Sequence, residues 1–429
     1  MDFTNLHKML RAPIVGYADL ECLVTPETDV DTSTGVDPDA AKRPRTENQQ
    51  QQYQTHKAAS YFTTFVSTDP NFSLESDPSE AFEYPQREPY IGEDAADKLL
   101  NYLTTAADRM HEKLFPPAEM IFTEEDKARY DAETQCHICL KKYEAIKHVV
   151  HAHRPEDDLS RCGDCKTNDR IRDLGFTEPV HHTHRKDQKV KDCADCKTNN
   201  RSKVRDHCHI EGTFRSAAHL ECNLQYSIKS NNWKLPVFFH NLRGYDGHLL
   251  LKAVNKKYGR CRVIPTNMEK YLAIQVGRVQ FLDSMQFVPK SLDTLVGSMK
   301  EEDFVQTKKL FGIPHGPRPS LIHHCHQDHD DIDACEWCMI NQGEERIQQT
   351  FQKGIFPYDH FDSLDRLSET SLPDRDAFYN RLTDKEISDS DMDHARRVWE
   401  LQGCHTLRDY HNFYLKCDVA LLADFFEKF

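Results

Sequence analysis

The chain has 429 residues, of which 29% are charged and 38% hydrophobic, and a formal net charge of −15 at pH 7. This length allows two or three domains with a sizeable core, while the acidic charge argues against a protein that holds nucleic acid over its whole surface. No apolar run is long enough to span a membrane or to serve as a secretion signal. The fifteen cysteines occur largely as C-x2-C pairs beside histidines, which is typical of metal binding in an intracellular protein.

Residues 13–24 predict a strand, because they are apolar and β-branched around two acids, Asp19 and Glu21. Side chains alternate along a strand, so both acids point to the same face. Paired acids in an apolar strand repel each other and resist desolvation, and they need a cation or a solvent-exposed edge. A strand end whose acids simply face water is the alternative, but the apolar run continues beyond Glu21.

Residues 25–57 predict a disordered loop, since they are rich in Asp, Thr, Pro and Gln. The basic KRPR within this loop is either a weak nuclear-import signal or part of a solvated surface. A returning strand is expected at 61–66 and an amphipathic helix at 95–114.

Residues 136–226 form a different kind of segment, with many Cys, His and charged residues and few large apolar ones. Such a segment cannot bury enough surface to fold by itself. HAHR at 151–154 and CGDCKTNDR at 162–170 recur 31 residues later as HTHR and CADCKTNNR, which indicates a tandem duplication. Residues 136–235 hold 19 Lys and Arg against 14 Asp and Glu, a net charge of +5 that could hold a phosphate backbone.

The run PVFFHNLRGYDGHLLL, residues 236–251, predicts a buried strand at 237–239 that turns through a glycine into a helix. Asp246 then lies in the first turn of that helix, where a carboxylate also complements the helix dipole. A hairpin is expected at 271–287, a short helix at 291–299 and a second Cys/His insertion at 316–345.

The last predicted helix follows Thr406, which forms a capping-box pattern with Asp409 ahead of an apolar stripe. Tyr414 and Asp418 are four residues apart on this helix and share a face.

Four acids lie within apolar stretches of the sequence, where a charged side chain is unfavourable: Asp19, Glu21, Asp246 and Asp418. Gathered at one sheet edge they would repel each other unless they held divalent cations. Oxygen-only ligation suits Mg²⁺ or Mn²⁺, and two such ions about 3.5–4 Å apart can drive phosphodiester hydrolysis. Tyr414, one helical turn from Asp418, is placed to orient the attacking water.

Three motifs resemble, in order, the exonuclease motifs of B-family DNA polymerases: D-L-E at 19–21, N-x3-Y-D at 241–246 and Y-x3-D at 414–418. The runs FFHNLRGYDGHLL, FLDSMQF, KGIFPYDHFDS and YHNFYLKCDVALLADFFEKF look like those of the protein-primed polymerases of Polinton/Maverick and adintovirus-type mobile elements. The resemblance implies a ribonuclease-H-like 3′-to-5′ proofreading domain. It also implies contacts of Asn241, Tyr245, Ser291 and Leu292 with single-stranded DNA, and a terminal protein as a further partner.

The Cys/His segment resembles the phage recombination endonucleases of the ββα-metal class, through C-x2-C at 136–139, DHCH at 206–209 and RSAAHLECN at 215–223. The resemblance implies zinc ligation by Cys136, Cys139, His219 and Cys222. It places Asp206 and Asn223 on a catalytic metal, His207 as general base and His209 beside it. Further zinc sites are expected from Cys162, Cys165, Cys193 and Cys196, unless duplication alone explains them, and from Cys325, His329, Cys335 and Cys338.

We therefore expect an α/β protein with a ribonuclease-H-like exonuclease fold, a mixed sheet with flanking helices, formed by residues 1–135 and 227–429. A small zinc-stabilised ββα-type insertion at 136–226 interrupts it, and a polymerase palm is not expected in this chain. The expected activity is two-metal 3′-to-5′ DNA exonuclease action, in a nuclear, viral or mobile-element setting. The alternatives are a catalytically silent zinc-dependent nucleic-acid-binding remnant and a ββα-metal endonuclease that uses Asp206 and His207.

Overall fold

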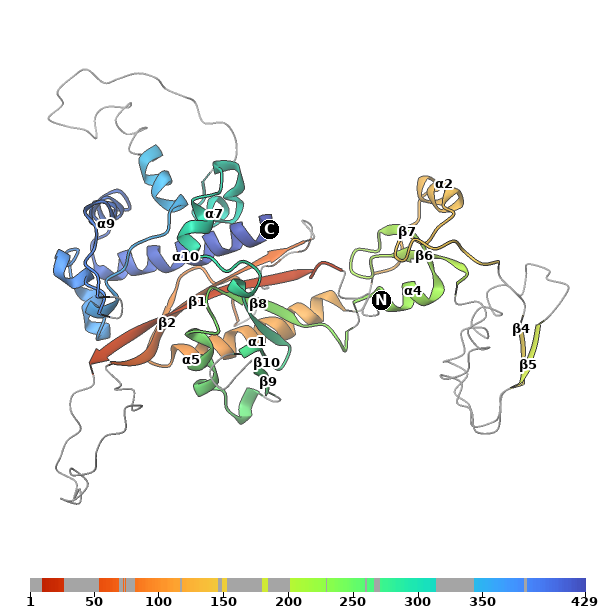
Figure 1. The fold of residues 1–429 in the computed structure, drawn as a ribbon, viewed down its shortest axis with the longest axis horizontal. Coiled ribbons are helices and arrows are strands. Elements are labelled where there is room, and N and C mark those ends of the chain that lie inside the picture. Colours follow the sequence, from red (N-terminus) through yellow and green to blue (C-terminus); the bar gives the residue numbers. More distant parts are fainter. Residues whose placement is uncertain are drawn as a thin grey trace, which may run out of the picture. The chain divides into compact units, whose positions relative to one another are not determined.

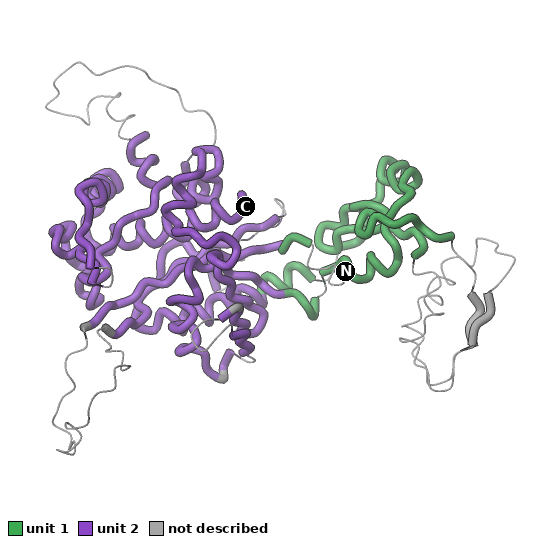
Figure 2. Tube along the Cα trace, viewed as in Figure 1, with its two compact units in different colours: residues 1–12, 109–233 green, residues 13–108, 234–429 purple. Residues whose placement is uncertain are grey.

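The structure is a computed structural model that describes most of the chain in two units. The described residues are 10–26, 54–68, 72, 74, 82–115, 118–145, 201–228, 230–258, 261–265, 271–313, 343–381 and 384–429, together with the strands at 149–152 and 180–183. Unit 1 comprises 1–12 and 109–233, and unit 2 comprises 13–108 and 234–429, as Figure 2 shows. Within the described residues, no helix has both the length and the apolar character that a membrane span requires.

Unit 2 is built on a seven-stranded mixed sheet. In spatial order its strands are β3 (Tyr90–Ile91), β2 (Gln54–Ser67), β1 (Ile14–Pro26), β8 (Leu235–Phe239), β11 (Val279–Asp283), β10 (Tyr271–Val276) and β9 (Cys261–Pro265). β8 is parallel to both β1 and β11, and the other neighbours are antiparallel. The expected mixed sheet, the strand at 13–24 and the hairpin at 271–287 are confirmed.

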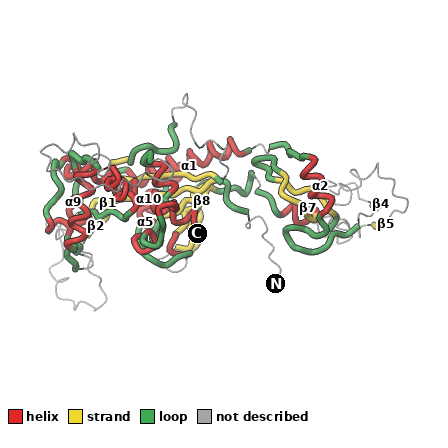
Figure 3. Tube along the Cα trace, turned by 90° about the horizontal axis from the view of Figure 1, so that it is seen from above, coloured by secondary structure: helices red, strands yellow, loops and turns green. Residues whose placement is uncertain are grey.

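The two longest helices of the described chain cover opposite faces of this sheet (Figure 1, Figure 3). Ser60 and Tyr61 are neighbours on β2 and therefore point to opposite faces. The Ser60 hydroxyl lies 2.9 Å from His411 Nε2 on α10 (Leu407–Lys428), whereas Tyr61 packs against Tyr102 on α1 (Ala95–Leu114). The shorter helices are α5 (Asp246–Ala253), α6 (Leu292–Val296), α7 (Val305–Leu310) and α9 (Asp389–Leu401).

β1 is much longer than its parallel neighbour β8, so part of one edge of β1 has no β8 residue beside it. Gly16 pairs with Val237 and Tyr17 with Phe238, so β8 ends beside the first third of β1. From Asp19 onward one edge of β1 is no longer covered by β8. The ends of strands at such an opening are where α/β sheets usually hold their ligands.

The loop expected at 25–57 is shorter than predicted, because β1 runs to Pro26 and β2 begins at Gln54. Polar Gln54 to Lys57 look like loop by composition, but their backbone pairs with the end of β1 and so extends the hairpin. A β-bulge interrupts the pairing between Glu21, opposite Ser60, and Cys22, opposite Ala58.

Unit 1 contains α2 (Glu124–Ala132), an antiparallel pair of β6 (Lys203–His207) and β7 (Phe214–His219), and α4 (Leu220–Gln225) directly after β7. The two copies of the duplicated sequence meet in β4 (Val149–Ala152) and β5 (Val180–Thr183), which pair in parallel with equivalent residues opposite each other. The cysteines predicted for the second and third zinc sites, at 162, 165, 193, 196, 325, 335 and 338, lie outside the described residues.

Candidate functional site

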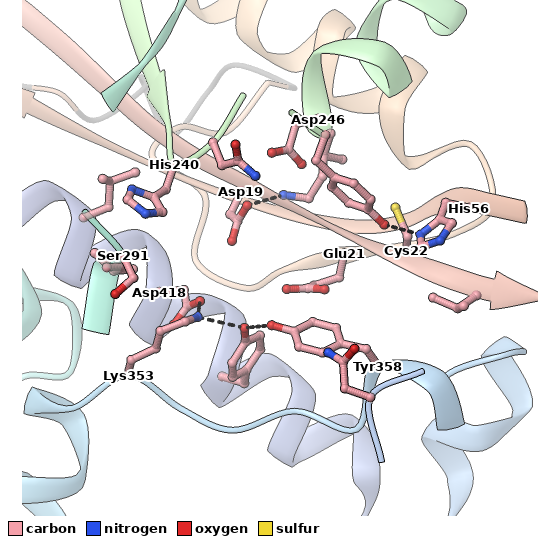
Figure 4. Close-up of a pocket in the computed structure, with 18 of the residues that line it drawn as sticks. Asp19, Glu21, Cys22, His56, His240, Asp246, Ser291, Lys353, Tyr358 and Asp418 are labelled. Carbon is pink, nitrogen blue, oxygen red and sulfur yellow. Dashed lines mark hydrogen bonds and ion pairs between the residues drawn. The ribbon is translucent and has the colours of Figure 1, made fainter. Parts of the chain in front are cut away.

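A cavity of about 380 Å³ lies beside the uncovered edge of β1 in unit 2 (Figure 4). β1 supplies its floor, the start of α5 and the loop before it supply one wall, and α10 supplies another. Every unit 2 residue predicted for the nuclease site lines this cavity: Asp19, Glu21, Asn241, Tyr245, Asp246, Ser291, Leu292, Tyr414 and Asp418. Four chain segments that are separate in the sequence therefore meet at one place.

The carboxylates in the cavity are more buried than acids normally are. Glu21, Asp246 and Asp418 are 6%, 3% and 4% exposed. Oδ1 of Asp246 and Oδ1 of Asp418 are buried and accept no hydrogen bond from any described residue. A buried oxygen without a partner costs about 1–3 kcal/mol, and more when it is charged, so these two atoms mark a place where a cation fits.

Burial also changes the protonation of this cluster. Burial, followed by repulsion from the nearby Asp418 carboxylate, raises the pKa of Asp19 to about 7, although Lys353 lowers it. Burial, followed by repulsion from Asp19, raises the pKa of Glu21 and of Asp246 well above their usual values. Clustered buried carboxylates behave in this way when their negative charge exceeds the positive charge among them.

Lys353 is a cation inside the cavity that the sequence motifs did not single out. Its Nζ forms an ion pair with Asp418 Oδ2 and donates to the Tyr414 hydroxyl at 3.1 Å. Burial lowers the pKa of Lys353, but the Asp418 carboxylate more than offsets this and leaves the pKa above its usual value. The Tyr414 hydroxyl also lies 2.5 Å from that of Tyr358. The sequence offered one signal for Lys353, namely a single lysine at the start of the apolar run KGIFPY.

Asp283, at the end of β11, holds the loop that carries Asn241 and Asp246. Its buried carboxylate accepts hydrogen bonds from the backbone N–H groups of Asn241 and Arg243 at 3.1 Å each, and from Arg243 Nε at 3.1 Å. Asn241 has a left-handed φ of 66°, and a Cβ on Gly244 would meet its side-chain oxygen at 2.6 Å. The loop is therefore tight, and Asp283 fixes it from the neighbouring strand.

The carboxylates do not converge on a single point. Among the described residues, no three of them bring one oxygen each within 4.8 Å of one another. A site for two ions about 3.5–4 Å apart divides its ligands between the ions, so wider spacing across the cavity is compatible with such a site.

Unit 1 holds a compact cluster of metal-binding side chains. One ligand atom from each of Cys136, Cys139, His219 and Cys222 lies within 4.8 Å of the other three. Zinc bound tetrahedrally at 2.0–2.3 Å separates its ligands by roughly 3.5–4 Å, so the four residues could hold an ion such as zinc. Among the described residues this is the one cluster of its kind.

The surroundings of His219 suit this ligation. Its Nε2 lies 3.0 Å from the Lys142 carbonyl and donates to it, which leaves Nδ1 unprotonated and 3.2 Å from Cys139 Sγ. A second partner that fixes the tautomer in this way is typical of metal-bound histidine. Leu140 follows the C-x2-C pair with a φ of 58°, and its N–H donates to the Cys136 carbonyl at 2.8 Å, which closes the turn.

The second predicted site, on β6, has a different character. Asp206 is fully buried and both of its oxygens accept hydrogen bonds, from Arg215 at 2.8 and 2.9 Å and from His137 at 2.9 Å. The rings of His207 and His209 lie 4.4 Å apart, and burial lowers the pKa of both. Asn223, on α4, donates to the Arg205 carbonyl at 3.4 Å. The sequence did not anticipate Arg215 as the partner of Asp206.

No protein-family model, curated protein or solved structure matches this chain at a significant level.

Proposed function

We propose that unit 2 is a metal-dependent nuclease that removes nucleotides from the 3′ ends of single-stranded DNA. One observation carries this proposal: acids from β1, α5 and α10 line one cavity, and two of their oxygens are buried without a partner among the described residues. The mixed sheet with helices on both faces is compatible with the ribonuclease-H-like fold that the three motifs imply.

The residues of the cavity divide naturally by role. Asp19, Glu21, Asp246 and Asp418 would hold two Mg²⁺ or Mn²⁺ ions, which when bound supply charge stabilisation for phosphodiester hydrolysis. The Tyr414 hydroxyl, fixed by Lys353 and Tyr358, is placed to orient a water molecule beside Asp418.

The rim of the cavity offers groups that suit a DNA end. Asn241 and Tyr245, close to Asp246 in the chain, line the cavity, and so do Ser291 and Leu292. Bases stack on aromatic rings, and such contacts do not depend on sequence. By its resemblance to protein-primed B-family polymerases, we place this nuclease as the proofreading part of such an enzyme, with a terminal protein as its partner.

Substitution of the carboxylates tests the activity. A 5′-labelled single-stranded oligonucleotide in Mg²⁺ should shorten stepwise, and Asp19→Asn or Asp418→Asn should slow this by about 100-fold or more, since several kcal/mol of charge stabilisation would be lost. Asp393→Ala, an exposed acid on α9, is the matched control and should leave the rate unchanged. Degradation at the wild-type rate in both site variants would overturn the proposal.

A second function is proposed for unit 1, because β6, β7 and α4 follow one another as a hairpin and a helix around the Cys136 cluster. We propose that this module binds nucleic acid when it holds zinc, and that Asp206 and His207 form a nuclease site of the ββα-metal type. Nicking of circular or branched DNA that persists in Asp418→Asn and disappears in His207→Ala would support the nuclease. If unit 1 binds DNA in a zinc-dependent, salt-sensitive manner but does not cleave it, its function would be nucleic-acid binding alone.

A further inference from the structure

A tyrosine and a histidine from separate elements meet in the wall of the unit 2 cavity. The hydroxyl of Tyr245, the residue that precedes α5, lies 2.6 Å from Nδ1 of His56 on β2. The two rings meet edge to face, with centroids 5.4 Å apart and an interplanar angle of 85°. The thiol of Cys22 on β1 also contacts the Tyr245 hydroxyl. Figure 4 shows Cys22 next to His56 and marks the hydrogen bond of His56 with a dashed line.

The β-bulge in the β1–β2 hairpin brings His56 to this position. After the bulge, His56 lies directly opposite Val24 and Ala58 opposite Cys22. Directly opposed residues of an antiparallel pair point to the same face, and Cys22 and Val24 share that face. Without the extra residue in β2, Lys57 would lie opposite Val24 and His56 would turn to the other face. Bulges near active sites commonly redirect a side chain in this manner.

The hydrogen bond fixes the ring of Tyr245. The Tyr245 hydroxyl and Nδ1 of His56 share this hydrogen bond, and the tautomer of the imidazole sets which of the two donates. The ring adjoins Asp246, whose carboxylate belongs to the proposed metal site, and it lines the same cavity. A ring held at one end has less freedom to lose when a base stacks on it, which strengthens binding through preorganisation.

We propose that His56 is a positioning residue that holds the Tyr245 ring as a platform for the 3′-terminal base of single-stranded DNA. This inference rests on the proposed function of unit 2. His56 acts through Tyr245 and needs no contact with the reacting atoms.

The test measures DNA binding and cleavage separately. Binding of a fluorescent single-stranded oligonucleotide is followed in EDTA with the full chain, and cleavage is followed in Mg²⁺. His56→Phe and Tyr245→Phe should each weaken binding by roughly three- to tenfold, with an increase in KM and little change in kcat. The double variant should bind no more weakly than either single variant, because both changes remove the same bond.

Two controls separate positioning from a loss of structure. His56→Asn retains an acceptor near the position of Nδ1 and should bind within twofold of the wild type. Lys57→Ala alters the next residue, whose ion pair with Glu93 is exposed, and should have no effect. If His56→Phe does not fold, Tyr245→Phe removes the same hydrogen bond from the other side.

The outcomes distinguish this inference from the proposed function. Wild-type binding in His56→Phe, or losses that multiply in the double variant, would overturn the positioning role even if the enzyme cleaves DNA. Conversely, a wild-type chain that binds DNA but never shortens it would overturn the nuclease proposal, while the expected binding pattern would still support His56. A chain that binds no single-stranded DNA would overturn both.

Discussion

At the scale of single residues, the site depends on side chains that are costly to bury and that support one another. Lys353 pairs with Asp418 and also holds Tyr414, so one cation serves two of the residues that the motifs identified. The sequence identified acids because acids in apolar runs are conspicuous. It did not identify Lys353, His56 or Asp283, because each acts through a contact with a residue remote in the chain.

Gly354 provides a test of how tightly Tyr414 is held. A Cβ at this position would lie 2.7 Å from Cδ2 of the Tyr414 ring, which is closer than two carbon atoms can approach. Gly354→Ala should therefore displace the ring or Lys353, and a shift of about 1 Å at such a site can reduce kcat by about 100-fold.

The matched control for this substitution is Gly297→Ala. Gly297 ends α6 with a φ of −60°, and an added Cβ meets ordinary contacts there, at 3.4 Å or beyond. Steady-state kinetics of both variants decide the matter, and equal kcat values would show that Tyr414 does not need its present position.

At the scale of elements, features that depend on nearby residues were predicted correctly, whereas features that depend on contacts between distant residues were not. The capping box of Thr406 and Asp409 forms as expected at the start of α10, Asp246 begins α5, and the helix at 95–114 has the predicted bounds. These features depend on residues a few positions apart, so their signals are in the local sequence. The bulge near Ala59 and the pairing of Gln54 to Lys57 depend on register with β1, which composition does not encode.

The docking of α7 on α10 should depend on pH through Asp424. Its buried carboxylate accepts hydrogen bonds from the N–H groups of Gln306 and Thr307 at the start of α7. Burial raises the pKa of Asp424 to about 6, although these hydrogen bonds lower it. Because the pKa is raised in the folded state, the associated stability is fully present below about pH 4 and is lost as the pH rises through 6.

Urea unfolding of the wild type and of Asp424→Asn measures this effect. The free energy of unfolding of the wild type, relative to the variant, should fall by up to about 3 kcal/mol between pH 4 and pH 7, which corresponds to a shift of roughly two pH units. A difference between the two proteins that stays constant over this range would contradict the role of Asp424.

At the scale of the whole molecule, the chain combines two units whose buried cores differ in size and composition. Unit 2 has a large apolar core, whereas the buried cluster around Cys136 consists of Ala218 and Cys222, with Ile138, Cys139 and Tyr143 against it. The sequence predicted this contrast from composition. Contacts group residues 1–12, 109–135 and 227–233 with unit 1, in addition to the stretch 136–226 that its composition sets apart.

Removal of one of the four side chains that could hold zinc should affect the two units differently. Cys222→Ser should lower the zinc content by one ion per chain and unfold unit 1, since structural zinc contributes roughly 10–16 kcal/mol of binding free energy in small domains. Elemental analysis and limited proteolysis would show this. Cleavage of a short single-stranded oligonucleotide by unit 2 should stay within about twofold of the wild type. Unchanged zinc content would contradict ligation by Cys222.

The order in which the chain is synthesised gives the position of α10 a further consequence. The first acids of the cavity are on β1 and the last, Asp418, is on α10, so the cavity has no complete set of carboxylates until that helix has left the ribosome and packed against the sheet. A nascent chain that ends before Leu407 would lack both Tyr414 and Asp418. Such a fragment should not shorten the 3′ ends of single-stranded DNA, so the activity proposed for unit 2 would arise only after α10 has been made.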